Sequence, residues 1–261
     1  MTDAPTMSDT DLAADAALPD EPYVAGMCHD HQLHALPREW AQHAIGQQMD
    51  GPVAAAAVCG HLTTVMLAMP SLSEWRPTRL CAYCGWAVAI ETGTISQRLD
   101  VLTPDGRTRA ALARLVGDPL AARRICEAVI AHASGPGAEY ELDHGATIQI
   151  LAEITRHAPT LGLPEDCAED SCDHHLAGHG DQGLDASREC DYPVASAVCP
   201  ACTLRAGAWA GEWEGTFMGE CYIHAPCQVL AALAARYKVK VRPTHAIGVR
   251  SPTASRGWIP C

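Results

Sequence analysis

Apolar residues recur at helical spacing in four stretches of the chain. These stretches span residues 36–49, 108–132, 146–158 and 225–239. Their spacing predicts amphipathic helices, because positions three and four residues apart share one face of a helix. Pro37 and Pro226 stand near the start of the first and last stretch, where the first helical turn tolerates proline.

The stretch at 108–132 divides into two helices at Gly117, Asp118 and Pro119. Asp118 can cap the second helix, and Pro119 suits its first position. We expect an ordinary helical hairpin that packs its apolar side chains inward, namely Leu112, Leu115, Ile125 and Val129. A DNA-binding helix-turn-helix is the alternative interpretation of the same pattern.

Short runs of β-branched and small apolar residues predict strands in further segments. Residues 51–70 and 78–90 each place such runs on both sides of a pair of Cys or His residues. Residues 206–217 alternate large and small side chains around Gly211. Turn residues between strand-like runs are typical of β-hairpins, so we expect hairpins at these three places.

The chain contains 13 cysteines and 13 histidines in 261 residues. Its N-terminal stretch is acidic and has neither the basic nor the apolar region of a signal peptide, and no segment has the roughly 18 apolar residues of a membrane span. We therefore expect a cytoplasmic protein with no membrane partner. In a reducing compartment, clustered Cys and His residues are more often metal ligands or redox groups than disulfides.

The first cluster consists of Cys59 and His61, followed by Cys81 and Cys84. A Cys-x-x-Cys turn presents two thiolates to one Zn²⁺ ion, which takes four sulfur or nitrogen ligands in a tetrahedron. Gly85, directly after the second thiol, allows the positive φ that such a turn often needs. Two hairpin tips facing each other across one metal are typical of a zinc ribbon, which this cluster resembles with Cys-x-His in place of one Cys-x-x-Cys. The alternative is a buried structural Cys59 and an unrelated His61.

Cys199 and Cys202 form a second Cys-x-x-Cys pair, and three more candidate ligands follow at Cys221, His224 and Cys227. Cys227 falls at the first turn of the last predicted helix, where the helix dipole favours a thiolate. A Cys-x-x-Cys knuckle, a hairpin and a helix that supplies the remaining ligands occur in this order in treble-clef zinc sites, which the segment resembles over about forty residues. His224 and Cys227 compete for the fourth position beside Cys199, Cys202 and Cys221.

Upstream residues offer other ways to complete the second site. Cys172 and His174 repeat the Cys-x-His spacing of the first cluster, and Cys190 lies nearby in the sequence. A duplicated ribbon of Cys172, His174, Cys199 and Cys202 is therefore a rival assignment. A further metal site can draw its ligands from Cys28, His29, His31, Cys221 and Cys227.

Two enzymatic interpretations fit parts of the second cluster. The sequence from Cys199 to Cys202 resembles the active-site motif of thioredoxin-like proteins, but the glycines that follow disfavour the helix which lowers the pKa of the first thiol in that family. Cys167 and Glu169, ahead of this pair, have the order of a zinc-deaminase signature, with Val198 where that signature has proline. The sequence has no G-x-S-x-G and no Walker A motif. We therefore expect a non-catalytic protein.

Charge is distributed unevenly along the chain, whose formal net charge is -13. Residues 138–191 carry 13 acidic residues and two arginines, whereas no acidic residue follows Glu220. The basic residues of this last segment are candidate contacts for nucleic-acid phosphates, in particular Lys238, Lys240 and Arg242. The acidic segments, with Trp209 and Trp213, suit a basic or apolar protein partner instead.

These patterns predict an α+β protein in which small zinc-stabilised β-hairpin modules are combined with a helical middle segment. The expected parts are a disordered acidic tail at 1–22, a zinc-ribbon-like module with the helical hairpin at 23–135, a helix and an acidic Cys/His-rich loop at 136–192, and a treble-clef-like module with a basic tail at 193–261. Two Zn²⁺ ions are expected as cofactors. The excess of arginine over lysine and the absence of asparagine are typical of GC-rich bacterial or phage genomes. The predicted function is a nucleic-acid-associated regulator, and the alternative is a protein-interaction adaptor.

Overall fold

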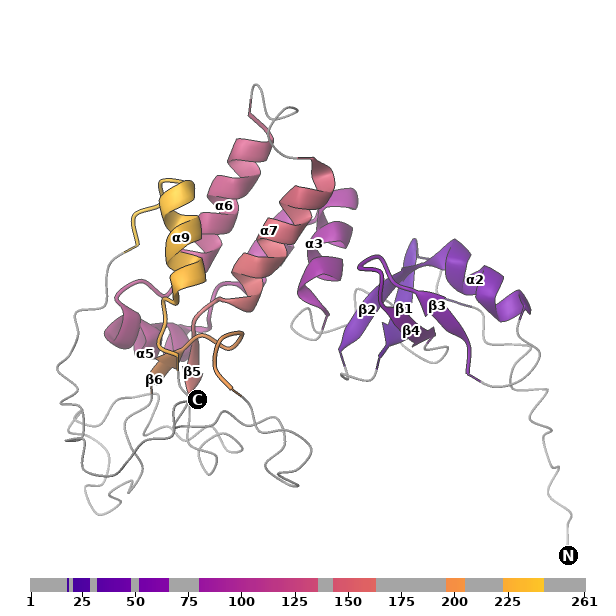
Figure 1. Ribbon diagram of the computed structural model, residues 1–261, viewed down its shortest axis with the longest axis horizontal. Helices are drawn as coiled ribbons and strands as arrows, with labels where there is room; N and C mark the ends of the chain where they lie inside the picture. Colours follow the sequence, from indigo (N-terminus) through magenta and orange to yellow (C-terminus); the bar gives the residue numbers. More distant parts are fainter. Residues whose placement is uncertain are drawn as a thin grey trace, which may run out of the picture. The chain divides into compact units, whose positions relative to one another are not determined.

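A computed structural model of the chain describes residues 18, 21–28, 32–47, 52–65, 80–135, 143–162, 196–204 and 223–241. Within these residues it has seven α-helices and six β-strands (Figure 1). The predicted α+β class is therefore confirmed. The chain divides into two compact units, Met1–Arg98 and Leu99–Cys261, each with a sheet of its own.

The first unit is built on a four-stranded antiparallel sheet with the strand order β2-β1-β4-β3. Its strands are β1 (Tyr23–Met27), β2 (Leu33–Pro37), β3 (Ala54–Ala56) and β4 (Leu62–Val65). Helix α2 (Arg38–Gln47) follows β2 directly, and helix α3 (Ala82–Glu91) packs next to β2. The sheet and α3 form the frame on which the first candidate site is built.

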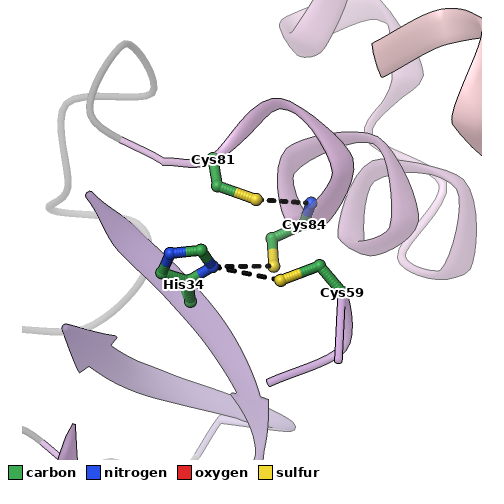
Figure 2. Close-up of side chains that lie close together, drawn as sticks. All are labelled: His34, Cys59, Cys81 and Cys84. Carbon is green, nitrogen blue, oxygen red and sulfur yellow. Dashed lines mark hydrogen bonds between the residues drawn. The ribbon is translucent and has the colours of Figure 1, made fainter. Parts of the chain in front are cut away.

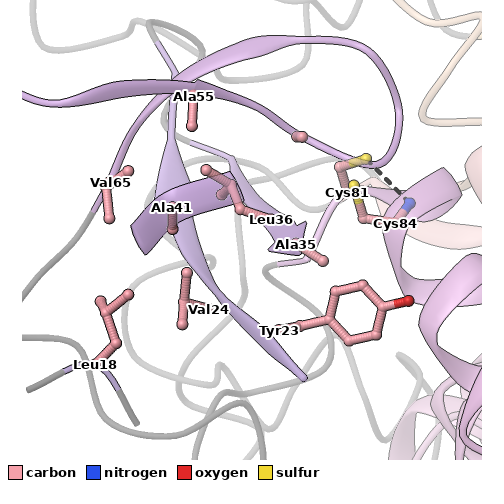
Figure 3. Packing of buried hydrophobic residues seen from close by; sticks show 11 residues of the cluster. Leu18, Tyr23, Val24, Ala35, Leu36, Ala41, Ala55, Val65, Cys81 and Cys84 are labelled. Atoms are coloured by element: carbon pink, nitrogen blue, oxygen red, sulfur yellow. Dashed lines mark hydrogen bonds between the residues drawn. The ribbon is translucent and has the colours of Figure 1, made fainter. Parts of the chain in front are cut away.

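Small side chains make up much of the core of the first unit (Figure 3). Four of its eleven buried members are alanines, and two are the cysteines Cys81 and Cys84. Leu18, which falls in the predicted acidic tail, also packs in this core, whereas residues 1–17 lie outside the described part of the chain. Hydrophobic stabilisation scales with the apolar area removed from water, so a core with many alanines gains less of it than a core of larger side chains. A second source of stability would therefore benefit this unit.

Gly85 lies inside α3 and not in a left-handed turn, so the expectation that it supplies a positive φ was wrong. A Cβ atom at this position would come within 2.5 Å of Cζ of Arg98. Arg98 is buried, and its guanidinium lies 5.9 Å from the ring centroid of Trp86. Glycine at this position therefore allows the close approach of the Arg98 guanidinium. The positive φ belongs to Gly60, at 85°, directly after Cys59.

The second unit combines several helices with a two-stranded antiparallel sheet. Its elements are α5 (Gly106–Val116), α6 (Ala121–Ala133), α7 (His144–Arg156), β5 (Thr160–Gly162), β6 (Ser196–Val198) and α9 (Gln228–Arg236). Helix α4 (Ile95–Val101) spans the boundary between the units. Helix α6 packs against α7 and α9, and α5 packs against the small sheet (Figure 1).

All four stretches with helical periodicity form helices, and the 108–132 stretch divides into α5 and α6 as predicted. Leu112, Ile125 and Val129 are fully buried in this pair. Asp118 does not cap α6, because the N-cap is Leu120 and the Asp118 carboxylate forms an ion pair with Arg124.

The hairpin predicted at 51–70 is confirmed as β3 and β4, which pair antiparallel with Cys59 in the turn between them. The hairpin predicted at 78–90 was wrong, because this segment forms helix α3. Its alanines favour a helix, and Cys81 occupies the N-cap. The hairpin expected at 206–217 lies outside the described residues.

Candidate metal centres

Four side chains from three places in the first unit converge on one point (Figure 2). His34 lies on β2, Cys59 in the turn between β3 and β4, and Cys81 and Cys84 at the start of α3. One ligand atom from each residue lies within 4.8 Å of the corresponding atom of the others. The Nδ1 atom of His34 is 3.1 Å from Sγ of Cys59 and 3.9 Å from Sγ of Cys84.

The local backbone explains why Cys59 reaches this point. The amide of Ala57 donates to the carbonyl of His61 at 2.8 Å, and the amide of Gly60 donates to the carbonyl of Ala57 at 2.8 Å. These bonds close a tight turn whose left-handed residue is Gly60, a conformation that glycine adopts without steric cost. The turn holds Cys59 at the tip of the hairpin.

The other cysteines of this group are positioned by the start of α3. The amide of Cys81 donates to the carbonyl of Leu33 at 2.8 Å, which places the helix beside His34 on the neighbouring position of β2. The Cys81 sulfur then accepts from the amide of Cys84 at 3.4 Å, as an N-cap side chain does. The helix N-terminus also favours negative charge on both sulfurs.

The structure brings together Cys59, Cys81 and Cys84, three of the four ligands predicted for the first site, but takes His34 in place of His61. His61 is exposed at the hairpin tip, with Nδ1 3.3 Å from Sγ of Cys59 and its ring centroid 5.2 Å from that of His34. His34 is only 2% exposed, because β2 is buried from Leu33 to Leu36. The position of His34 within a short apolar run is the sequence feature that could have indicated its burial.

The three thiols of this group influence one another electrostatically. Hydrogen bonds with Cys81 and Cys84 lower the pKa of the Cys59 thiol. The same contacts, together with burial, raise the pKa of the Cys81 and Cys84 thiols. One thiolate therefore forms readily, whereas three thiolates at this point require a cation to offset their mutual repulsion.

The second group lies in the second unit and consists of His157, Cys199, Cys202 and Cys227. The Nδ1 atom of His157 is 3.2 Å from Sγ of Cys199, 3.5 Å from Sγ of Cys202 and 3.4 Å from Sγ of Cys227. In a tetrahedral site, Zn–S bonds of about 2.3 Å and Zn–N bonds of about 2.0 Å place sulfur and nitrogen about 3.5 Å apart. The three sulfurs thus surround the imidazole nitrogen at distances close to those of a tetrahedral zinc site.

Three elements supply the ligands of the second group. His157 is the C-cap of α7, and Cys227 is the N-cap of α9 with no hydrogen bond from its sulfur to the helix. Cys199 follows β6, where its amide donates to the carbonyl of Ile223 at 2.8 Å. The amides of Cys202 and Thr203 both donate to the carbonyl of Cys199, at 3.2 and 3.0 Å, and form the turn that brings the two thiols to one side.

A carboxylate lies on the other side of the His157 imidazole. Its Nε2 atom lies 3.5 Å from Oε2 of Glu153, one turn earlier on α7. Glu153 also accepts from Gln149 at 3.1 Å and pairs with Arg156. Histidine ligands of metal ions commonly donate their second ring N–H to such a carboxylate, which fixes the ring and raises its basicity.

Burial raises the pKa of the Cys199 thiol to about 12. Desolvation also raises the pKa of the Cys202 thiol, although this side chain is the exposed member of the group. As isolated thiols these groups would stay protonated at neutral pH, whereas a bound divalent cation deprotonates its thiol ligands. The arrangement is therefore suited to metal binding.

The residues predicted for the second site are brought together only in part. Cys199, Cys202 and Cys227 meet in one group, whereas His224 is exposed and pairs with Val198 through its backbone, outside the group. Cys221 and the alternates Cys172, His174 and Cys190 lie outside the described residues. His157 was missed because it stands 42 residues before Cys199, with no spacing that links the two.

The geometry does not support the thioredoxin-like interpretation, and the zinc-deaminase interpretation concerns residues that are not described. Thr203 and Leu204, which follow Cys202, are not helical, and Cys199 is buried against His157 and Cys227. A thioredoxin-like site needs an accessible first thiol at the start of a helix. Cys167 and Glu169 of the deaminase signature lie outside the described residues.

The protein is of the α+β class, and its described residues form two Cys₃His groups that can hold metal ions. No protein-family model, no curated protein and no solved structure matches the chain. Among the described helices, none combines the length and the apolar character that a membrane span requires.

Proposed function

We propose that this chain is a zinc-binding protein in which each Cys₃His group holds one structural Zn²⁺ ion. The observation that carries this proposal is the placement of three sulfurs at 3.2–3.5 Å around Nδ1 of His157, repeated in a looser form around His34. Thiolate and imidazole ligands in a tetrahedron are the preferred environment of zinc. Four protein ligands also leave no open position for a substrate, so the two ions are structural and not catalytic.

A structural role for zinc agrees with what the groups connect. The first group joins β2, the β3–β4 turn and α3 of a unit whose core contains four alanines. The second joins the end of α7, the turn after β6 and the start of α9. In both units, one ion would tie together elements that are distant in the sequence, as structural zinc sites do.

The zinc content of the purified protein tests this proposal. We expect elemental analysis to find close to two zinc ions per chain, because each group supplies four ligands. The variant Cys84→Ser is expected to retain about one ion, because it removes one ligand from the first group. The matched control is Cys126→Ser, since Cys126 is a fully buried cysteine of α6 outside both groups. Two ions in Cys84→Ser, or a wild-type chain free of zinc, would contradict the proposal.

We further propose that the protein associates with nucleic acid through the basic segment that follows α9. Lys238 and Lys240 are exposed there, and Nη2 of Arg124 donates to the carbonyl of Lys240 at 2.9 Å, which anchors the segment to α6. Arg242, the third predicted contact, lies outside the described residues. Lysines on an anchored surface segment suit phosphate contacts, which act mainly through charge.

Salt-dependent binding tests this second proposal. Replacing Lys238 and Lys240 by glutamine is expected to reduce the slope of log K against log salt by about two, because each lost phosphate contact lowers it by about one. The charge-preserving Lys→Arg variants at both positions should keep the slope. Absence of binding to DNA and RNA even at low salt would overturn the proposal and favour the protein-interaction adaptor, whose candidate residues Trp209 and Trp213 lie outside the described part of the chain.

A further inference from the structure

A hollow of about 390 Å³ lies in the second unit, where the last turns of α6 and α9 meet. It is lined by Ala128, His132, Arg236, Tyr237 and Lys238. The rings of His132 and Tyr237 meet edge to face, with centroids 5.7 Å apart, and form one wall. The volume is at the small end of the range of roughly 300–1,000 Å³ found for ligand sites, so the hollow suits a compact ligand.

The charge of this hollow is one-sided. Arg236 and Lys238 are both exposed, and neither forms an ion pair with another described residue. None of the described residues that line it is acidic. A guanidinium, an ammonium, an imidazole and a phenol together offer several hydrogen-bond donors and two fixed positive charges. This set complements a phosphate group, which accepts several charge-assisted hydrogen bonds.

The backbone at Lys238 gives a second, independent observation. This residue has a φ of 57°, in the left-handed region. Its amide donates to the carbonyl of Ala235 at 3.2 Å, and the amide of Val239 donates to the carbonyl of Ala234 at 2.8 Å. The two bonds form a Schellman motif, in which the left-handed position is usually glycine because a Cβ atom is unfavourable there. A lysine at this position is therefore less stable than glycine would be, and backbone outliers of this kind cluster at ligand-binding sites.

Helix capping alone does not account for this arrangement. Cations near the C-terminus of a helix interact favourably with its dipole, and Arg236 in the last turn of α9 already fills that role. The Schellman motif also satisfies carbonyls at the end of the helix. A second cation at a position that prefers glycine, on the rim of a hollow, is better explained by a ligand of opposite charge.

We propose that this hollow is a phosphate-binding site, formed by Arg236, Lys238, His132 and Tyr237. The phosphate group would be presented by a nucleic-acid strand, either at its 5′ end or as an internal phosphodiester. Only this source rests on the proposed nucleic-acid association, because binding of phosphate to the hollow can be measured without any strand.

The test is a titration of the full zinc-loaded protein with inorganic phosphate at constant ionic strength in chloride, followed by NMR shifts of the backbone amides. The amides of Tyr237 and Lys238 are expected to shift in a saturable manner. Lys238→Gly is expected to weaken phosphate binding by about tenfold, the loss that follows from one hydrogen bond to a charged group. The same variant should keep or raise the melting temperature, because glycine relieves the left-handed strain.

Two further variants test which charges bind the phosphate. Arg236→Gln should weaken phosphate binding similarly, whereas Arg109→Gln, which removes an exposed charge on α5 outside the hollow, should leave it unchanged. Unshifted amides, or equal affinity in Lys238→Gly and the wild type, would overturn the site and leave the two cations as helix-end charges.

Oligonucleotides of one sequence, with and without a 5′-phosphate, then distinguish the sources. Displacement of inorganic phosphate by the phosphorylated strand alone identifies a terminal phosphate, and equal displacement by both strands identifies an internal phosphodiester. If inorganic phosphate binds and neither strand displaces it, the hollow remains a phosphate site and a nucleic-acid strand is overturned as its source, whereas the salt-dependent binding assay decides the nucleic-acid association itself.

Discussion

Removal of zinc is expected to unfold both units of the protein. Structural zinc sites contribute about 10–16 kcal/mol of apparent binding free energy, whereas whole domains are stable by only about 5–15 kcal/mol. The first unit in particular has Cys81 and Cys84 within its core, so without a cation its buried thiols are left around an empty position. We therefore expect the loss of most helical and sheet signal in circular dichroism when a strong chelator is added, and its recovery when zinc is returned.

The two ions should leave at different rates. Cys202 of the second group is exposed, whereas three of the four members of the first group are buried and Cys59 is half-buried. A chelator reaches an exposed thiolate first, so we expect biphasic zinc release with the second unit unfolding ahead of the first. NMR amide signals from β1 and β2, compared with those from α7 and α9, would report the two steps separately. A chain that is free of zinc and retains both sets of signals would contradict a structural role for the metal.

Replacing His157 by alanine is expected to remove one zinc ion and to unfold the second unit. His157 Nδ1 is the atom around which all three sulfurs of this group gather, so its loss leaves three thiolates without the fourth ligand. The matched control is His224→Ala, because His224 follows the same Cys-x-x-Cys pair in sequence but is exposed outside the group. Zinc analysis and circular dichroism of the two variants should differ clearly: one ion per chain for His157→Ala and two for His224→Ala.

A milder variant tests the geometry around the same ligand. Glu153→Gln keeps the shape of the side chain next to Nε2 of His157 but removes its charge. Loss of such an outer partner typically costs about 10–100-fold in metal affinity, so we expect zinc competition assays to show a drop in this range with the fold intact.

The His157 and His224 variants have an outcome that would contradict the assignment of His157. Retention of zinc by His157→Ala together with its loss from His224→Ala would instead restore the ligand assignment that the sequence spacing favoured.

The cysteine ligands were predictable from the sequence, because ligands that come from one turn keep a fixed local spacing. Cys81 with Cys84, and Cys199 with Cys202, each lie three residues apart, and both pairs belong to the groups that the structure forms. Cys59 and Cys227 were found through turn and helix signals next to them. Residues close in the sequence determine turns and helix starts, so short-range patterns are enough to predict these ligands.

The histidine ligands were not predictable by the same route, because tertiary packing decides which histidine meets the thiols. His61 and His224 have the expected spacing but lie at exposed positions, whereas His34 and His157 are brought in by a buried strand and by the end of a helix. The prediction of a hairpin at residues 78–90 was wrong for a related reason. Short apolar runs are ambiguous between strand and helix, and here the alanines and the N-cap at Cys81 favour the helix.

The second group also lies close to both ends of the long connection between β5 and β6. Strands β5 and β6 pair so that Gly162 lies opposite Ser196, and His157 and Cys199 meet a few residues further on either side. The 33 residues from 163 to 195 therefore leave and re-enter the fold at adjacent points. Doubling the length of such a connection costs only about 0.6 kcal/mol in closure entropy. The length and sequence of this acidic connection can therefore change at little cost to the stability of the scaffold that carries His157 and Cys199.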